Sequence, residues 1–492
     1  LLPVLACSRN RSESTEKSQL LQVEVQSDMA AGHQVMEKAQ TWPVNQLRTQ
    51  YLIVGGGIAG MAAAVHLKDE NFILCELSET LGGTSGSARF GAEVFSQGAH
   101  YDLPWPGAFG QQVTSLFEKL GVVHFNSLKN RWDFTDSQFM IAPEDESRSY
   151  VRGTWREDLL PETPALQRFF GFLEQYAGKL VLPTRLVPQE LHRYNQFSFH
   201  ELLQRFKPDY SLLEAMDYHM MDDYGGNTRQ LAAMAGMYYY GSRPWFTSEA
   251  EIFSPPQGNN YFIEKMASVL PPGQLCTSHL VKRIKPAKEG FFVEVMDLRQ
   301  QRLLRIHTRK VIYAGQKHAL PWVFPEEGPL FSANSYAPWM VLNFVFKEGT
   351  QLPAGYWQSE MIGPESAFLG FVDSDAQQAG SKRVLTAYYC LAPEDRKLLA
   401  AVPERKQETA VRTLGHIARF FNLEYPYLAR ATEKVFIKVM GHAMPVPVPG
   451  FLFNDRNARR KYAGLVYAGV DNSRLPLMLE AADSGILAAN AA

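Results

Sequence analysis

The chain contains the stretch Tyr51-Leu-Ile-Val-Gly-Gly-Gly-Ile-Ala-Gly60, and Asn71-Phe-Ile-Leu-Cys-Glu76 follows it. The apolar runs predict two β-strands, and the region between them predicts a glycine turn and a helix. The second strand ends on an acidic residue. Strand, glycine turn, helix, strand and acid in this order are typical of a unit that binds a dinucleotide. A lone glycine motif often only makes a turn, but here all the parts are in register, so we predict a dinucleotide site.

The glycines of this motif have different predicted roles. Gly55 permits the tight turn out of the first strand, and Gly57 lets the backbone come close to a pyrophosphate. Gly60 allows the helix to pack closely on the sheet. The helix begins at Ile58 and Ala59, where the N–H groups and the helix dipole point toward the phosphates. The whole turn is therefore expected to bind the pyrophosphate.

A second glycine-rich loop follows the acidic residue. Glu76 lies 21 residues after Gly55, near the spacing of about 20 at which a carboxylate binds the ribose. The loop Leu81-Gly-Gly-Thr-Ser-Gly-Ser87 begins soon after it. A nicotinamide cofactor has no need of such a loop. Extended FAD runs past the second strand and needs more backbone donors, so the loop favours FAD.

At this point the sequence resembles the flavin-containing amine oxidase superfamily, whose members pair the first glycine motif with a nearby Gly-Gly loop. The resemblance implies that Gly82, Gly83 and Thr84 contact FAD. The family usually has Arg at the position of Thr84, so this chain lacks one cationic contact to phosphate.

The resemblance continues at separated places along the chain. Ala99-His100-Tyr101 is similar to the segment that runs beneath the isoalloxazine in that family. His279-Leu-Val-Lys-Arg-Ile284 is similar to the strand whose backbone, near Val281, binds the adenine. Lys310-Val-Ile-Tyr-Ala-Gly315 is similar to the strand that closes the FAD sheet. The order of these segments supports the prediction of FAD.

The C-terminal region completes the resemblance. Leu465-Val-Tyr-Ala-Gly-Val-Asp471 is similar to the family's last FAD motif, which implies that Gly469 and Asp471 hold the pyrophosphate and ribityl. The next helix, from Leu479 to Ala489, would point its N-terminus at the flavin pyrimidine. A helix dipole in this place stabilises negative charge near N1 of reduced flavin by up to ~2 kcal/mol.

The expected fold is α/β, with an FAD-binding, Rossmann-like domain of three layers (ββα) and an interleaved α+β substrate domain. At 492 residues the chain exceeds the roughly 250–300 residues of a single core. Strand-rich and helix-rich regions alternate along it. The predicted boundaries are 1–47 for an N-terminal tether, 48–110, 251–325 and 433–492 for the FAD-binding domain, and 111–250 and 326–432 for the substrate domain.

The composition argues against several classes of protein. The 49 basic and 51 acidic residues give a net charge of −2, so no overall field favours nucleic acid or an anionic membrane. The four cysteines have no C-x-x-C spacing, which argues against a disulfide framework or a zinc ribbon. The histidines form no H-E-x-x-H motif, so we predict no metal. No apolar run reaches the roughly 18 residues of a membrane span.

The first residues, Leu1-Leu-Pro-Val-Leu-Ala-Cys7, resemble the end of a bacterial lipoprotein signal peptide. The resemblance implies a lipid anchor at Cys7 and a location on the periplasmic side of a bacterial membrane. Residues 8–47 are polar and poor in aromatics, which predicts a disordered tether. The alternative is a truncated chain or a cloning remnant with an incidental cysteine.

Two segments are candidates for the catalytic chemistry, and the first is Met221–Arg243. It resembles a stretch of bacterial members in which an Asp-Tyr-Gly-Gly turn precedes a helix of small residues. Pro255–Tyr261 then resembles their Pro-x-Gly-Asn loop. Small residues would let the helix approach the flavin, so that Tyr239 and Tyr240 line the pocket as catalytic candidates. The alternative is that these tyrosines are ordinary core aromatics.

The second segment is Met440–Gly450, which in amine oxidases crosses the face of the flavin. It contains no cysteine, so non-covalent FAD is predicted. His442 is the candidate for acid–base work because an imidazole titrates near neutrality. A histidine bonded to the backbone of a proline-stiffened loop is the alternative. The family's lysine, which holds a water near flavin N5, has no recognisable counterpart in the sequence, so rapid reduction of O₂ is in doubt.

The predicted function is hydride transfer from the C–H beside the nitrogen of an amine, such as a polyamine, to N5 of FAD. The electron acceptor would be O₂ or a quinone. Candidate acids for a cationic substrate are Asp222, Asp223, Glu249 and Glu251. The alternatives are a desaturase or protoporphyrinogen-oxidase-like enzyme with an apolar substrate, and an FAD-binding module without turnover. An acid pair facing aromatic rings would favour the amine, a wide apolar tunnel the desaturase, and a closed pocket the module.

Overall fold

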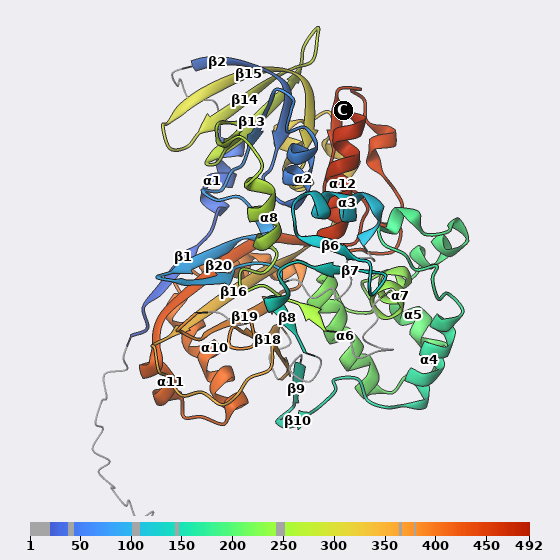
Figure 1. Cartoon of the computed structure of the whole chain (residues 1–492), viewed down its shortest axis with the longest axis vertical. Coiled ribbons are helices and arrows are strands. Elements are labelled where there is room, and N and C mark those ends of the chain that lie inside the picture. The colour runs from blue at the N-terminus through green and yellow to red at the C-terminus, as the bar shows by residue number, and fades with distance from the viewer. Residues whose placement is uncertain are drawn as a thin grey trace, which may run out of the picture.

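Two β-sheets form the framework of the protein, one in each of two domains. The computed structural model describes residues 20–37, 44–100, 109–142, 147–242, 251–363, 367–377 and 380–492. In Figure 1 the first domain lies at the top and combines blue, yellow and red segments, while the second lies below it. Segments from both ends of the chain therefore meet in the upper domain.

The upper domain is built on parallel strands whose apolar side chains are buried on both faces. Leu52 and Ile53, for example, are fully buried, as expected for a parallel sheet covered on both sides. Because β2 lies between β3 and β15, the glycine turn after Val54 lies at the end of a central strand of this sheet. In spatial order the strands are β12 (Leu275–Cys276), β3 (Phe72–Cys75), β2 (Val44–Val54), β15 (Arg302–Tyr313) and β21 (Leu465–Tyr467).

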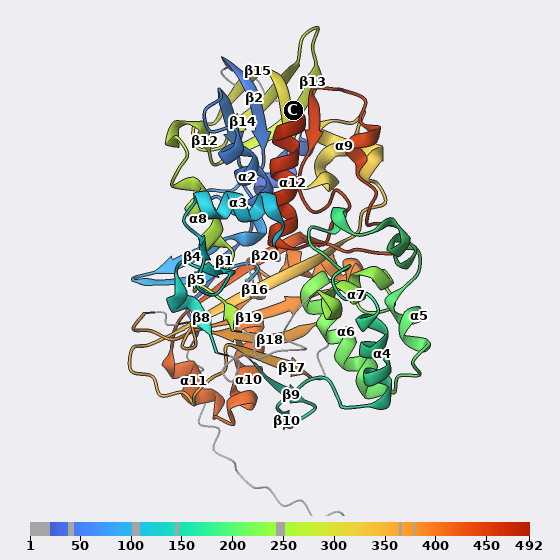
Figure 2. The ribbon, with the colours of Figure 1, turned by 45° about the vertical axis from the view of Figure 1, so that its right-hand side comes forward.

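Helices cover one face of this sheet. The helices α2 (Ile58–His66) and α12 (Met478–Ala491) pack against each other, and Figure 2 shows α12 in red beside α2. Gly485 makes this contact possible, because a Cβ there would lie only 2.1 Å from the carbonyl oxygen of Ala59. The helices α3 (Gln111–Lys119) and α8 (Asn260–Ala267) pack on α12 and α2, respectively.

An antiparallel meander forms the third layer. It consists of β13 (His279–Pro286), β14 (Phe291–Asp297) and the first half of β15. Val293, Val295 and Ile306 are fully buried in the core of this layer. Meander, parallel sheet and helices together make the predicted ββα arrangement, which the structure confirms.

The lower domain contains an eight-stranded mixed sheet. Every residue of β16, β18 and β19 is buried, which shows that the centre of the sheet is covered on both faces. The helices α10 (Lys406–Phe421) and α11 (Tyr425–Ala431) share one apolar core with it. In spatial order the strands are β1 (Val23–Gln26), β20 (Thr432–Pro445), β16 (Tyr336–Phe346), β19 (Val384–Cys390), β18 (Phe368–Asp373), β17 (Gln358–Ile362), β9 (Ser147–Val151) and β10 (Thr154–Arg156).

A group of helices, green in Figures 1 and 2, lies beside this sheet. Side-chain caps at Thr163, Ser198 and Asp209 start α4, α5 and α6, respectively. The group contains α4 (Pro164–Glu174), α5 (Phe199–Gln204), α6 (Tyr210–Tyr224) and α7 (Ala233–Gly241). The remaining short elements are α1 (Met29–His33), α9 (Leu320–Val323), β4 (Ser87–Phe90), β5 (Glu93–Ser96), β6 (Val123–Asn126), β7 (Arg131–Phe134), β8 (Met140–Ile141) and β11 (Ile252–Phe253).

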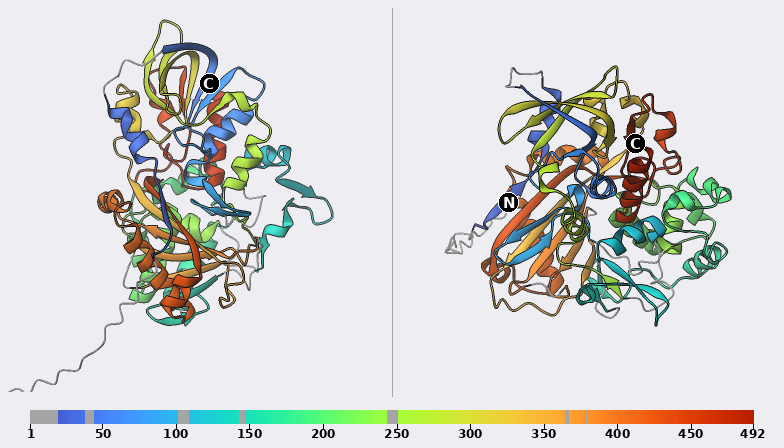
Figure 3. Two further views of the ribbon diagram at one scale, coloured as in Figure 1. Left: turned by 90° about the vertical axis from the view of Figure 1, so that its left-hand side faces the viewer. Right: turned by 45° about the horizontal axis from the view of Figure 1, so that its top comes forward.

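Two predicted boundaries differ from the structure. Residues 20–37 are not a disordered tether, because β1 pairs in parallel with β20 and the apolar Leu21 and Val23 are buried; Figure 3 shows this edge from two further directions. β2 also begins inside the predicted tether. Residues 433–445 belong to the eight-stranded sheet rather than to the FAD-binding domain, because their backbone pairs with β16.

Some of the sequence predictions concern residues outside the described ranges, namely Cys7, Tyr101 and Glu249. Within the described ranges, no helix combines the length and the apolar character that a membrane crossing requires. The same ranges contain no cluster of three or more side chains suited to hold a metal ion.

Candidate functional site

The first glycine turn has the geometry of a phosphate-binding loop. Gly55 has φ +99°, which favours glycine. At Gly60 a Cβ would lie 1.9 Å from the carbonyl oxygen of Gly55, so only glycine fits. Gly57 begins α2, and no side chain caps this end of the helix. The first N–H groups of α2, at Ile58 and Ala59, therefore remain available to an anion.

Glu76 lies beside this turn at the end of β3. The backbone N–H groups of Gly56 and Ser78 donate to its carboxylate at 2.6 and 2.8 Å. Burial raises the pKa of Glu76, while these hydrogen bonds oppose the shift. One bond to each oxygen leaves lone pairs for a hydroxyl group, so the side chain fits a ribose. The N–H of His279 donates to the carbonyl oxygen of Glu76 at 2.7 Å, so the start of β13 lies beside Glu76. Val281, two residues further along β13, is buried.

The second glycine loop packs directly on the first. The N–H of Gly82 donates to the carbonyl oxygen of Gly56 at 2.9 Å, and both Gly82 and Gly83 have positive φ. Asn260 fixes the loop from α8, because its side chain donates to the carbonyl oxygen of Ser85 at 3.0 Å. The predicted Pro-x-Gly-Asn segment thus supports the loop that was expected to bind FAD.

The start of α12 forms another uncapped helix end. No side chain caps its first turn, and Leu477 and Met478 at this end line the main cavity, together with Val470. The expectation that the N-terminus of this helix faces the flavin site therefore fits the geometry. Leu479 itself is fully buried in the hydrophobic core and is not in the cavity wall.

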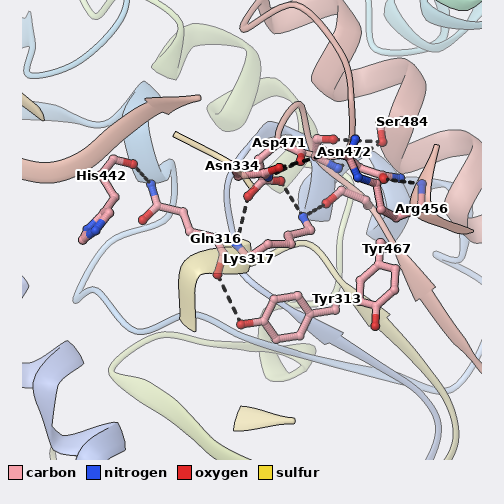
Figure 4. Close-up of polar contacts among 12 residues, drawn as sticks. Tyr313, Gln316, Lys317, Asn334, His442, Arg456, Tyr467, Asp471, Asn472 and Ser484 are labelled. Carbon is pink, nitrogen blue, oxygen red and sulfur yellow. Dashed lines mark hydrogen bonds and ion pairs between the residues drawn. The ribbon is translucent and has the colours of Figure 1, made fainter. Parts of the chain in front are cut away.

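Asp471 occupies a different environment from the one the resemblance implied. Its carboxylate pairs with the Nζ of Lys317 at 2.7 Å and accepts hydrogen bonds from the Lys317 N–H at 2.9 Å and from the Tyr336 hydroxyl at 3.1 Å (Figure 4). Lys317 is buried, which lowers its pKa. These bonds tie the turn that carries Gly469 and Val470 to Lys317 and Tyr336. No sequence motif pointed to Lys317, because this ion pair joins residues that are far apart in the chain.

One large cavity lies between the two domains. The space between its walls, including the part open to solvent, is about 1200 Å³. Its wall contains Thr84, Gly98 and Ala99 from the glycine-loop region and Leu477 and Met478 from α12. The wall residues that come from the second domain include Tyr218, Asp222, Asp223, Trp339, Val341, Trp357, Gln358, Leu369, Phe371, Tyr388, Met440 and Met444. The cavity therefore joins a cofactor end to a substrate end.

The substrate end combines two carboxylates with aromatic rings. Asp222 and Asp223 lie in the last turn of α6. The side chain of Gln358 donates to Asp222 at 3.0 Å. Burial is the main cause of the raised pKa of Tyr388, and the negative charge of Asp222 nearby raises this pKa as well. No lysine or arginine occurs among the described residues of the wall. Of the four acids predicted for a cationic substrate, these two reach the cavity, and Glu251 is exposed outside it.

His100 lies on the same wall, and the sequence prediction did not include it among the catalytic candidates. Both of its ring nitrogens are buried and have no hydrogen-bond partner among the described residues. Its ring lies edge-on to Tyr388 at 5.3 Å and to Trp357 at 6.4 Å between centroids. Burial lowers the pKa of His100 to about 3, so the ring is neutral. Only the three-dimensional structure reveals this environment.

The predicted catalytic tyrosines do not line the cavity. Tyr239 and Tyr240 are buried in α7. Tyr239 stacks on His219 with 5.2 Å between centroids, and the Tyr240 hydroxyl lies 2.9 Å from Nδ1 of the same histidine. Their role as core aromatics, which was the alternative interpretation, is the one that the structure supports.

His442 also lies outside the cavity wall. Its ring stacks on His318, with centroids 3.7 Å apart and planes within 10°, and its carbonyl oxygen accepts a hydrogen bond from Gln316 (Figure 4). Burial, with smaller contributions from His318 and Arg396, lowers the pKa of His442 to about 3. The neighbouring Met440, Ala443 and Met444 of β20 line the cavity instead.

The sequence matches a known family over most of its length. A sequence model of flavin containing amine oxidoreductases matches residues 58–492. The chain belongs to this family. It is therefore an FAD-dependent oxidoreductase, and the glycine turns, Glu76 and the two uncapped helix ends fit FAD. None of the described cysteines lies in the cavity wall, and no lysine does, so the family's lysine near flavin N5 has no counterpart among the described wall residues.

Solved structures share the fold of this family member at low sequence identity. A putative protoporphyrinogen oxidase from Exiguobacterium sp. has a TM-score of 0.64 and 17% identity, covering 90% of this chain and 98% of its own. The structure of putrescine oxidase bound to putrescine has a TM-score of 0.60 and 13% identity, and the match covers 91% of this chain and 99% of that protein. Cyclohexylamine oxidase from Brevibacterium oxydans has a TM-score of 0.63 and 15% identity, and the match covers 90% of this chain and 98% of that protein. No curated protein matches the sequence at a significant level.

Proposed function

We propose that the protein oxidises an organic amine that binds as a cation at the substrate end of the cavity. The observation that carries this proposal is the pair Asp222 and Asp223 on a wall that also contains Tyr218, Trp357 and Tyr388. The described part of that wall contains no lysine or arginine. Two carboxylates and several aromatic rings therefore lie together among the described residues of the wall.

Physical chemistry favours an ammonium group in this environment. A carboxylate in a partly desolvated cavity attracts a cation far more strongly than it does in water, and aromatic faces add cation–π attraction of about 0.5–2 kcal/mol. Asp222 and Asp223 lie in the last turn of α6, a 15-residue helix. The C-terminal end of a helix carries partial negative charge, so the helix adds to the attraction of the two carboxylates.

The chain's own residues would orient the amine for the reaction. The bound ammonium would first give up one proton, to Asp222 or to water, and bound FAD supplies the chemistry by accepting a hydride from the carbon next to the neutral nitrogen. Asp222, held by Gln358, would bind the nitrogen of the substrate. Val341, Leu369 and Phe371 in the wall would contact its carbon chain and exclude water. The electrons would then pass to O₂ or to a quinone.

Anaerobic reduction tests this proposal. The purified holoenzyme is mixed with monoamines, diamines and polyamines, and bleaching of the flavin spectrum is recorded. We expect at least one amine to reduce the flavin, and the double variant D222N/D223N to weaken its apparent affinity roughly 10- to 100-fold, because charged hydrogen bonds contribute about 1.5–3 kcal/mol. Reduction by no amine would contradict the proposal.

A matched control uses the same helix. Glu214 lies on α6 but forms an ion pair with Arg152 outside the cavity wall. The variant E214Q removes one negative charge from α6 without changing the cavity. Its affinity for the amine should equal that of the wild type, so a loss in E214Q as large as in D222N/D223N would show a general effect of charge rather than binding at the pair.

An apolar substrate is the second candidate function. The wall also contains Val341, Leu369, Phe371, Val372 and Met444, which favours a desaturase or protoporphyrinogen-oxidase-like reaction. Anaerobic reduction by protoporphyrinogen, unchanged in D222N/D223N, would support it over the amine. A flavin that none of these compounds reduces would instead indicate an FAD-binding module without turnover.

A further inference from the structure

The cavity wall contains a histidine, His100, that the proposed function does not use. His100 has both ring nitrogens buried, and no group in the described ranges hydrogen-bonds to either of them. The backbone that precedes this residue is held in place, because the N–H of Ala99 donates to the carbonyl oxygen of Thr84 at 2.9 Å and the carbonyl oxygen of Ala99 accepts from the N–H of Asn259 at 3.0 Å. The imidazole is therefore positioned, but its hydrogen-bonding capacity is unused.

The location of His100 connects the two ends of the cavity. It follows Gly98 and Ala99 at the cofactor end. Its ring touches the edges of Tyr388 and Trp357 at the substrate end. Gln358, which follows Trp357, bonds to Asp222. His100 and Asp222 thus lie in the wall of one cavity and both lie near Tyr388, so a nitrogen bound by the carboxylate would enter the same space that the imidazole faces.

We infer that His100 is a specificity-determining residue, whose neutral imidazole accepts a hydrogen bond from an N–H of the bound ammonium substrate. This inference rests on the proposed function. A buried polar group without a hydrogen-bond partner is unfavourable. A ligand whose N–H donates to this imidazole therefore binds more tightly. Asp222 and Asp223 supply the charge attraction, and His100 supplies a direction.

The protonation state of His100 supports this role rather than that of a base. Burial lowers its pKa to about 3, so the ring stays neutral and does not repel a cation. The ring keeps one N–H and one lone pair. The lone pair can accept from a primary or secondary ammonium, whereas a quaternary ammonium has no N–H to donate.

Two cations that cannot be oxidised separate charge attraction from hydrogen bonding. tert-Butylammonium has N–H groups but no hydrogen on the carbon next to nitrogen. Tetramethylammonium has the charge but no N–H. Binding to the oxidised holoenzyme is measured from the change in the flavin spectrum, so the readout is binding and not turnover. The variants are H100F and H100L, which remove the acceptor, and H100Q, which retains one.

We expect H100F and H100L to weaken binding of tert-butylammonium roughly tenfold, as for loss of one hydrogen bond to a charged donor. Binding of tetramethylammonium should stay within about twofold of wild type, and H100Q should recover most of the affinity for tert-butylammonium. The double variant D222N/D223N should weaken the binding of both cations. FAD content and thermal unfolding of each variant show whether it is folded.

Two results would overturn the inference. Equal losses for both cations in H100F and H100L, or no loss for either, would show that the imidazole makes no hydrogen bond to the substrate nitrogen, while the amine proposal would stand. A wild-type holoenzyme that binds neither cation and is reduced by no amine would remove the proposed function, and this inference with it.

Discussion

The stacked pair His318 and His442 shows how the environment of single residues changes their chemistry. Burial, together with the nearby charge of Arg396, lowers the pKa of His318 to about 4 and that of His442 to about 3. A histidine in water has a pKa of about 6.5. His442 was expected to exchange protons near neutrality, but in the folded protein it is neutral there and lies outside the cavity wall.

These two residues predict how stability depends on pH. Their pKa values are lower in the folded than in the unfolded chain, so the unfolded chain binds more protons between pH 6.5 and 4. The contribution of these two histidines to the free energy of unfolding is therefore fully present above pH 6.5 and decreases as the pH falls below it. For His318 the loss at pH 5 should be about 1–2 kcal/mol, with a smaller loss for the more exposed His442.

Urea unfolding at pH 7.5 and pH 5 measures this dependence. The variant H318F should lose less stability between the two values than the wild type, because it has no imidazole to protonate. The control is H124Q, at an exposed position of β6, which should show the wild-type dependence. A wild-type slope in H318F would contradict the prediction.

At the scale of elements, the helix ends determine where FAD binds. α2 and α12 both begin without a side-chain cap, which leaves their first N–H groups for the cofactor. The local sequence encodes α2, because the glycines of the turn are spaced for it. It also encodes the start of α12, although the cavity contact occurs at Leu477 and Met478 rather than at the predicted Leu479.

Gly60 provides a test of the first helix end. A Cβ at Gly60 would lie 1.9 Å from the carbonyl oxygen of Gly55, so G60A must shift the turn. We expect G60A to purify with little or no FAD and with a lower Tm. The measurements are the ratio of flavin to protein absorbance and thermal unfolding.

The control for G60A is a glycine at an open position of a helix. Gly171 lies in α4, where a Cβ meets no atom within 4 Å. G171A should therefore keep its FAD and gain about 0.5–1 kcal/mol of stability, because alanine favours a helix over glycine. A G60A protein with full FAD content would contradict the proposed fit of the turn.

At the scale of the whole molecule, residues 20–26 are part of the fold. β1 extends the eight-stranded sheet beside β20. Leu21 and Val23 are 5% and 9% exposed and join the core under α10. The sequence predicted a tether here because the region is polar overall and its apolar residues are few. The neighbouring strand comes from the other end of the chain, so no local pattern could indicate the pairing.

The contribution of this strand is measurable. The variant L21S/V23S should lower the free energy of unfolding by about 3–5 kcal/mol, since each buried aliphatic side chain contributes about 1.5–3 kcal/mol. The control Q22S changes the exposed residue between them and should stay within about 0.5 kcal/mol of wild type. Equal stability of L21S/V23S and wild type would show that β1 does not hold the sheet edge.

Local sequence encodes the cofactor half of this protein. The glycine turns and Glu76 are near one another in the chain, and their function depends on local backbone geometry, which short motifs encode. The tertiary structure alone decided the substrate half. His100, Asp222, Trp357 and Tyr388 come from four distant segments, and Lys317 meets Asp471 across another long separation. Only packing brings such side chains together, because burial and the pairing of strands distant in the chain depend on the complete fold.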